Sequence, residues 1–151
     1  MFPIADLSAK KPSESKPGDL VLAHQYESML GLIVDADGHR GLVKLDEESN
    51  FPFLYIEDVT YDFLILANWS VEVNTESFGS PSIGDSKKGD LILSGQTFAI
   101  STGMQGYNWR FNFKGKMLTQ EDDRQFYFPG WSITHGEGAA KQTVFERSPA
   151  D

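Results

Sequence analysis

The stretch Lys16-Pro17-Gly18-Asp19-Leu20-Val21-Leu22 recurs 71 positions later as Lys87-Lys88-Gly89-Asp90-Leu91-Ile92-Leu93, in a chain of 151 residues. Five of the seven positions are identical, and Val21 is replaced by the similar Ile92. The two copies divide the chain into halves of nearly equal length, each long enough for one small β-unit. A recurrence of this kind indicates a duplicated structural unit.

The composition favours strands and turns over helices. The chain contains 14 Gly, seven Pro and many aromatic residues, and no segment shows a 3.6-residue apolar period over ten or more residues. The Ser/Lys/Pro-rich start predicts a flexible lead-in over residues 1–16, followed by a first β-unit over 17–76. A Gly/Ser/Pro-rich stretch predicts a linker over 77–87, and a second β-unit follows over 88–148.

The first half contains the clearest local signals. Apolar segments flank Asp37-Gly38, a dipeptide typical of tight hairpin turns. The short continuous apolar run 63–66 predicts a strand that is buried on both faces. Trp69, Val71 and Val73 alternate with polar residues, which predicts a strand with one buried face.

The second half repeats this plan. We predict strands over 90–93, 97–101, 107–113, 116–118, 125–128, 131–134 and 143–145. Residues 115–118, followed by the acidic run 121–123, echo 41–45 followed by 46–48. This alignment predicts that the offset between the copies rises from 71 to about 74.

The order of motifs in the first half resembles the opening of an SH3-like small barrel. A Gly-Asp-Leu-Val-Leu strand is followed by a strand that ends in a short hairpin, and a third strand enters with Gly41-Leu42-Val43. The resemblance implies an all-β chain of two similar SH3-like small barrels, or one composite β-structure built from two repeated units. Such barrels bind peptides, nucleic acids or other subunits, so the resemblance implies no single activity.

Several classes of protein are disfavoured by composition. The absence of Cys removes disulfides, thiolate metal sites and Cys nucleophiles, and together with the lack of a secretion signal we expect a cytoplasmic protein. No apolar run is long enough to span a membrane. The net charge is −9, and residues 1–75 carry 13 acidic against 5 basic side chains. Nucleic acid, whose binding depends on Lys and Arg, is therefore not the expected partner.

Possible catalytic and metal-binding patterns fail on spacing. Asp35-Ala36-Asp37-Gly38 does not fit a calcium loop, because either choice of register puts a wrong residue at a required position. His24, His39 and His135 lack the close spacing of a zinc site. We predict no catalytic, cofactor-binding or metal-binding residues, no small-molecule ligand, and no enzyme.

The segment 107–116 combines aromatic and polar residues in strict alternation. Tyr107, Trp109, Phe111 and Phe113 would share one strand face and form core, which leaves a polar opposite face able to meet an anionic or amide-rich partner. That polar face consists of Asn108, Arg110, Asn112 and Lys114.

A second aromatic cluster, 126–131, lacks this alternation, so we expect some of its rings to be exposed at a subunit contact. The predicted interaction surface therefore comprises Asn108, Arg110, Asn112, Lys114, Tyr127 and Trp131. We expect a non-enzymatic binding or assembly module that forms a homo-oligomer or meets a protein partner, with Trp131 as the anchor. The alternatives are a nucleic-acid-binding small barrel that uses the face of residues 108–114, and a small enzyme whose site is assembled only by the fold.

Overall fold

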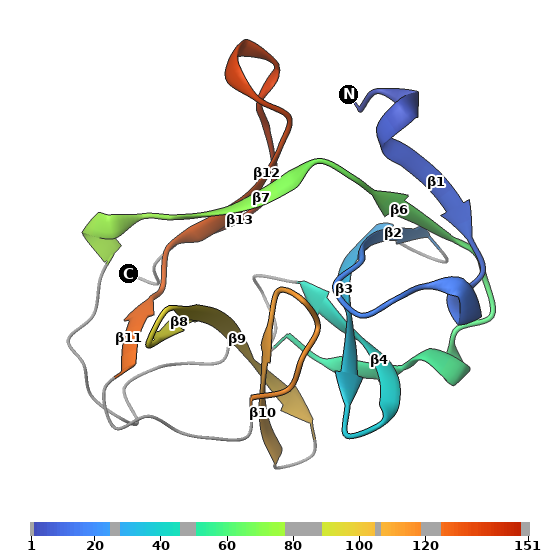
Figure 1. Cartoon of the computed structure of the whole chain (residues 1–151), viewed down its shortest axis with the longest axis horizontal. Coiled ribbons are helices and arrows are strands. Elements are labelled where there is room, and N and C mark those ends of the chain that lie inside the picture. The colour runs from blue at the N-terminus through green and yellow to red at the C-terminus, as the bar shows by residue number, and fades with distance from the viewer. Residues whose placement is uncertain are drawn as a thin grey trace.

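The described part of the chain folds mainly into β-strands (Figure 1). The computed structural model describes residues 2–24, 28–45, 51–77, 89–104, 107–118 and 125–148. Within these ranges there is no α-helix, which confirms the all-β prediction, and no helix there is long or apolar enough to cross a membrane. The strands are β1 (Leu7–Lys10), β2 (Leu20–His24), β3 (Ser28–Ala36), β4 (His39–Leu45), β5 (Phe53–Tyr55), β6 (Phe63–Leu66), β7 (Trp69–Val73), β8 (Leu91–Ser94), β9 (Thr97–Met104), β10 (Tyr107–Asn112), β11 (Gln125–Phe128), β12 (Trp131–His135) and β13 (Gln142–Arg147). Short 3-10 helices are η1 (Ile4–Asp6), η2 (Pro12–Glu14), η3 (Ile56–Asp58), η4 (Thr75–Ser77) and η5 (Gly138–Ala140).

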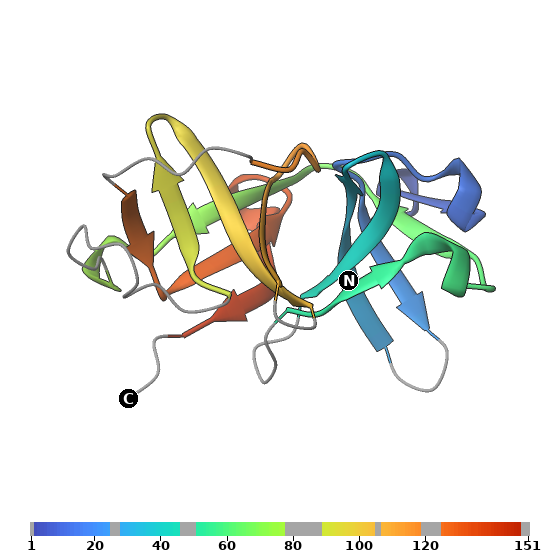
Figure 2. The same ribbon diagram turned by 90° about the horizontal axis from the view of Figure 1, so that it is seen from below.

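The strands form three antiparallel sheets. Sheet A has the order β1-β6-β2-β3-β4-β5, sheet B the order β10-β9-β8-β11, and sheet C the order β13-β12-β7. Sheet A lies on one side of the molecule and sheets B and C lie on the other (Figure 2). Among the described residues none of the three sheets closes into a barrel. The sequence-based expectation of barrels therefore holds only at the level of an all-β chain of antiparallel sheets.

The predicted hairpin at Asp37-Gly38 is confirmed. β3 and β4 pair with Ala36 opposite His39, which leaves Asp37 and Gly38 as a two-residue turn. Their φ angles are 55° and 87°, the paired positive values of a type I′ turn. The Gly38 N–H donates to Asp35 Oδ1 at 2.8 Å and closes the turn.

The two copies of the Gly-Asp-Leu motif occupy equivalent places in sheets A and B. Gly18 and Gly89 both have left-handed φ angles, 94° and 90°. Gly18 N donates to Ile33 O at 2.7 Å, and Gly89 N donates to Ser101 O at 3.1 Å, so each motif bonds the strand that follows it. β2 then pairs with β3 and β6, as β8 pairs with β9 and β11. From Gly18 and Gly89 onward, the two copies therefore share the left-handed Gly and the arrangement of paired strands.

The strand pairing also fixes which residues correspond. The order β6-β2-β3-β4-β5 is matched by β11-β8-β9-β10 followed by residues 116–118, which pair with β10 through the bridge between Phe111 and Met117. The corresponding positions are Leu20 and Leu91, Leu32 and Ile100, Val43 and Phe111, Phe53 and Met117, and Leu66 and Phe128.

The predicted rise of the offset toward 74 is wrong, because the offset falls along the chain from 71 at Leu20 to 62 at Leu66. The counterpart of β4 is β10, so residues 115–118 do not correspond to 41–45. Gly115 lies in the turn after β10, at φ 78°, where a Cβ would stand 2.6 Å from Gly18 N and from Ile33 O. Only Gly allows this turn of the second half to pack against the motif of the first.

Sheet C joins the two halves through like strands. Trp69-Ser70-Val71 at the start of β7 recurs as Trp131-Ser132-Ile133 at the start of β12, again 62 positions later. β7 and β12 pair antiparallel with Val71 opposite Ile133. Corresponding residues of the two strands are therefore exchanged by a local pseudo-two-fold axis through this central pair.

The main hydrophobic core is shared by the two halves. It combines Leu20, Leu32 and Leu66 of sheet A with Leu91 and Phe111 of sheet B and with residues of sheet C. A smaller cluster on the other face of sheet A lies under η3 and contains Val21, Ala23, Ile33, Leu42, Ile56, Val59 and Phe63. β6 contributes Leu66 to the main core and Phe63 to the smaller cluster, but Leu64 is 42% exposed, so the prediction that residues 63–66 are buried on both faces holds only in part.

The predicted flexible lead-in contains β1, which sequence analysis missed. β1 pairs with β6, with Leu7 opposite Leu66, and so forms the edge of sheet A. The predicted linker lies outside the described residues except for Ser77, as do the acidic runs 46–48 and 121–123.

Replacement of Gly38 by Val should lower the free energy of unfolding by roughly 1 kcal/mol or more, because a β-branched residue is strained at positive φ. A Cβ at Gly38 would meet nothing within 4 Å, so the loss would come from the backbone alone. Urea unfolding of Gly38→Val beside Gly38→Asn, which tolerates left-handed backbone, checks the reason. Equal losses in the two variants would contradict it.

Candidate functional site

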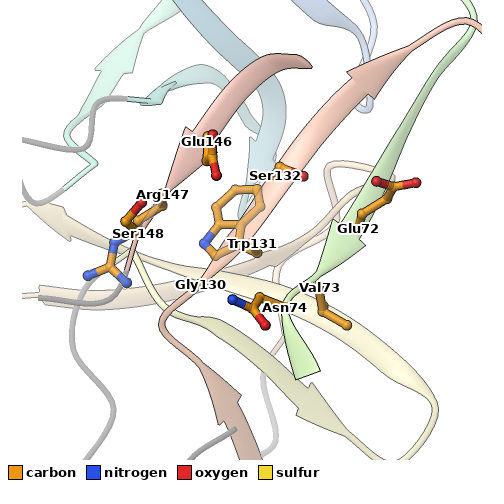
Figure 3. A pocket seen from close by; sticks show the side chains of 9 residues that line it. All are labelled: Glu72, Val73, Asn74, Gly130, Trp131, Ser132, Glu146, Arg147 and Ser148. Carbon is orange, nitrogen blue, oxygen red and sulfur yellow. The ribbon is translucent and has the colours of Figure 1, made fainter. Parts of the chain in front are cut away.

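A recess of about 170 Å³ lies where the ends of β7, β12 and β13 meet (Figure 3). It has room for a few water molecules. Its lining residues are Glu72, Val73, Asn74, Gly130, Trp131, Ser132, Glu146, Arg147 and Ser148. The recess contains the predicted anchor Trp131, so its geometry decides what that residue does.

Trp131 forms part of the core, with only 2% of its surface exposed. Its ring packs against Phe51, Phe113 and Phe145, with centroids 6.1, 5.8 and 5.0 Å away. Its Nε1–H donates to Gly89 O at 2.8 Å, which satisfies the buried polar atom. Trp131 therefore links β12 to the second Gly-Asp motif and is not an exposed anchor.

Arg147 closes the recess from β13 and bonds the same motif. Its guanidinium forms an ion pair with the buried carboxylate of Asp90, and its Nη1 also donates to Pro129 O at 3.0 Å. The corresponding Asp19 is only half-buried and accepts a hydrogen bond from Lys16 N at 2.8 Å within its own turn. Asp90 thus holds β13, and Asp19 bonds within its own turn.

The outer rim of the recess carries carboxylates and a hydroxyl. Glu72 and Glu146 lie opposite Ser132 on the two strands that flank it (Figure 3). Lys141 forms an ion pair with Glu72, and the charge of Arg147 is balanced by Asp90. The rim therefore has no excess positive charge with which to hold an anion.

His135 is not placed to act as a base for Ser132. His135 lies three residues further along β12, so its side chain is on the opposite face of the strand. There His135 Nε2 lies 2.8 Å from Asp6 Oδ2, and the ring of Phe2 packs edge-on against the imidazole. This partly buried pair ties the N-terminal segment to β12.

The predicted polar face of 108–114 is only partly assembled. Arg110 and Asn112 are half-buried, and Lys114 is exposed in the turn that follows β10. The side-chain oxygen of Asn112 accepts the backbone N–H groups of Lys114 and Lys116, at 3.0 and 2.9 Å. Asn112 therefore shapes a turn, and the side chain of Asn108 lies outside the described residues.

Tyr127 shares a sheet face with two of these side chains. Ile92 lies opposite both Tyr127 and Ala99, and Ala99 lies opposite Asn112, so Tyr127, Asn112 and Arg110 project from the same face of sheet B. Trp131 is separate from them, in the core beneath sheet C. Phe126, in the predicted aromatic cluster, is 36% exposed.

A different feature, the outer edge of β7, was not predicted. Asn74 N donates to Gly130 O at 2.9 Å, and Gly136 N donates to Asn68 O at 3.0 Å. Bonded residues alternate along an antiparallel pair, so the even-numbered residues of β7 bond β12. The N–H and C=O groups of Trp69, Val71 and Val73 therefore point away from β12, and no strand of the described residues pairs with them.

Burial shows the same asymmetry between the two like strands. Trp131 and Ile133 of β12 are fully buried, because β12 has β7 on one side and β13 on the other. Their counterparts Trp69 and Val71 are only half-buried. β13 thus occupies a place beside β12 that has no counterpart beside β7 among the described residues.

The sequence signal for this edge is the recurrence of Trp-Ser-Val as Trp-Ser-Ile, from Trp69 to Trp131. The offset of this recurrence is 62, which differs from the offset of 71 at Gly18, so the two recurrences do not align in one register of the sequence. The pairing of the strands connects the two offsets, because the offset between corresponding positions is 71 at Leu20 and 62 at Leu66.

Comparison with known proteins places the chain in a family. A family model described as uncharacterised protein y4lG matches residues 12–151, and the chain therefore belongs to the Y4lG family. No curated protein and no solved structure shows a significant match to it.

Replacement of Trp131 by Ala should lower the free energy of unfolding by roughly 3–5 kcal/mol, because it leaves a cavity in the core. The matched change Trp69→Ala should cost clearly less, since Trp69 is already half-exposed. Urea unfolding measures both. A Trp131→Ala variant that keeps the parental stability would show that Trp131 is not a core residue.

Proposed function

We propose that this chain is a non-enzymatic assembly module that takes up an additional β-strand along the outer edge of β7. The observation that carries the proposal is the asymmetry of sheet C. β7 and β12 are like strands related by a pseudo-two-fold axis, yet among the described residues only β12 has a strand on its outer side. The outward groups of Trp69, Val71 and Val73 are the hydrogen-bonding positions of an acceptor edge.

Strand addition would supply both affinity and selectivity at this edge. The incoming main chain would bond the outward N–H and C=O groups, and its alternate side chains would meet the face of β7. Completion of that face would bury the remaining surface of Trp69 and Val71, which are half-buried now. Both contributions favour an extended segment over a helix.

β13 provides an internal template for such a segment. It pairs antiparallel with β12, with Phe145 opposite Ile133 and Arg147 opposite Trp131. By correspondence, a strand on β7 would place an apolar residue opposite Val71 and a long side chain opposite Trp69.

The sequence of β7 lacks the residues that protect many exposed edges. Such edges commonly carry Lys or Pro, or are very short. β1, at the edge of sheet A, ends with Lys10 and is followed by Lys11-Pro12. β7 contains neither Lys nor Pro, and its one charged residue, Glu72, is paired with Lys141. The contrast supports a role for β7 in pairing.

The arrangement of strands also supports a finer description of the fold. We read each half as an SH3-like unit left open, and the chain as one composite structure built from two such units. The matching orders β6-β2-β3-β4-β5 and β11-β8-β9-β10 with 116–118, together with the shared core, favour this description.

Amide hydrogen exchange in dilute, monomeric protein tests the acceptor edge. The amides of Trp69, Val71 and Val73 should exchange fast, while those of Ser70 and Glu72, which bond β12, should exchange slowly. A synthetic peptide with the sequence of residues 142–147 at millimolar concentration should slow the amides of Trp69 and Val73, and a scrambled peptide should not. Slow exchange of the outward amides in the monomer without peptide would show that the edge is already covered.

Proline substitution supplies a matched pair of variants. Val71→Pro removes an outward N–H and part of a half-buried side chain, but no hydrogen bond to β12, and Pro is tolerated on edge strands with that orientation, so the variant should stay folded and lose the peptide effect. Ser70→Pro removes an N–H that bonds β12 and should destabilise the protein strongly. Circular dichroism and thermal melting distinguish the two. Equal stability of the two variants would contradict the assigned direction of the backbone groups.

A further inference from the structure

We infer that the strand taken up by β7 is β7 of a second copy of this chain, in an antiparallel pair centred on Val71. The inference rests on the proposed acceptor role of the β7 edge and names its occupant. It follows from three properties of β7: the direction of its backbone groups, its sequence, and its existing pairing with β12.

The backbone groups of β7 fit a two-fold axis at Val71. The outward-pointing residues are Trp69, Val71 and Val73, so the middle residue of the strand is itself outward-pointing. An axis through Val71 places Trp69 of each copy opposite Val73 of the other. All three outward residues then lie in hydrogen-bonded pairs, and all five residues of the strand overlap.

The side chains of β7 fit this register as well. Val71 would lie opposite Val71 of the second copy, and Ser70 opposite Glu72, so no like charges face each other across the pair. The existing pair of β7 with β12 already places the same kinds of residue opposite one another as the proposed pair does, in the same register. There Val71 faces Ile133, Glu72 faces Ser132 and Val73 faces Trp131. β7 therefore pairs within this chain with a strand of its own kind, in the register proposed between copies.

The resulting interface would continue sheet C. The pair would create one six-stranded sheet with the order β13-β12-β7-β7′-β12′-β13′, where primes mark the second copy. Such a contact is isologous and closes after two copies, so it gives a dimer and not a fibre. The surface buried by one pair of five-residue strands is smaller than the roughly 1,600 Å² of a standard interface. The dimer should therefore form at high protein concentration and dissociate on dilution.

The net negative charge of the chain opposes formation of this dimer. The net charge is −9, and most of the excess lies in residues 1–75, which include β7. Two copies therefore repel one another, while Glu72 at the contact is itself paired with Lys141. Salt screens the repulsion between copies, so association should strengthen from 0.05 to roughly 0.3 M NaCl.

Cysteine crosslinking tests the register, because the natural chain contains no Cys. Ser70 of one copy would lie opposite Glu72 of the other in a non-hydrogen-bonded pair, with Cα atoms about 4.5 Å apart, within disulfide reach. Ser70 of the two copies would be diagonal neighbours about 7–8 Å apart, beyond that reach. An equimolar mixture of Ser70→Cys and Glu72→Cys proteins should therefore crosslink on mild oxidation, whereas neither variant alone should.

Solution mass and amide exchange complete the experiment. The mass from light scattering should rise toward twice 16.9 kDa with concentration in the parent and remain 16.9 kDa in Val71→Pro. The amides of Trp69 and Val73 should become protected as the mass doubles. Leu64→Cys, at an exposed leucine on β6, is the control for random collision.

The outcomes distinguish the inference, that a second copy pairs with β7, from the proposed function, that the edge of β7 accepts a strand. Crosslinking confined to the mixture supports the inference. Two results would overturn the second copy as occupant but leave the acceptor edge standing. One is crosslinking of a single variant alone. The other is a protein that stays monomeric at all concentrations and whose outward amides are protected only by the 142–147 peptide. Outward amides that are protected in the monomer without peptide overturn both.

Discussion

The pairing of β7 with β12 is the interaction on which the rest of the structure depends. β7 is the last strand of the first half and β12 is the last but one of the second, and the two pair with Val71 opposite Ile133. This pairing brings one face of sheet A and one face of sheet B into a common core, where Leu20 and Leu91 are both fully buried. Neither sheet alone would bury that face, so the two halves stabilise each other.

The repeated Gly-Asp motif has the same Gly conformation in both halves, and its Asp is bound by different partners. Gly18 and Gly89 have the same φ and bond the following strand in the same way. Asp19 closes its own turn, whereas Asp90 is buried and held by Arg147. Arg147 is on β13, so this ion pair fastens β13 to the second copy. A buried carboxylate that lost its partner would be costly, which ties the position of β13 to the second motif.

Much of the fold is readable from the sequence because its signals are local. The turn at Asp37-Gly38 and six of the seven strands predicted in the second half follow from alternation and turn chemistry, whereas 116–118 forms only isolated bridges. The burial of Phe111 follows from the aromatic alternation in β10. β1 was missed because Leu7-Ser8-Ala9-Lys10 is short and lies among Ser, Lys and Pro residues. The correspondence between the halves drifted in the wrong direction because the connections are shorter in the second half, a difference that only the strand pairing reveals.

The candidate site could not be predicted in the same way, since it depends on what lies beside a strand. The sequence marks Trp69 and Trp131 as equivalent, but it does not state that one is covered by β13 and the other is not. From composition alone, a Trp is a candidate anchor for a partner. Here Trp131, the more buried of the two, is a core residue. The half-buried partner lies on the strand whose hydrogen-bonding groups point outward. Where two like strands of one chain differ in having a neighbour among the described residues, the strand without one is therefore the better candidate for binding a partner.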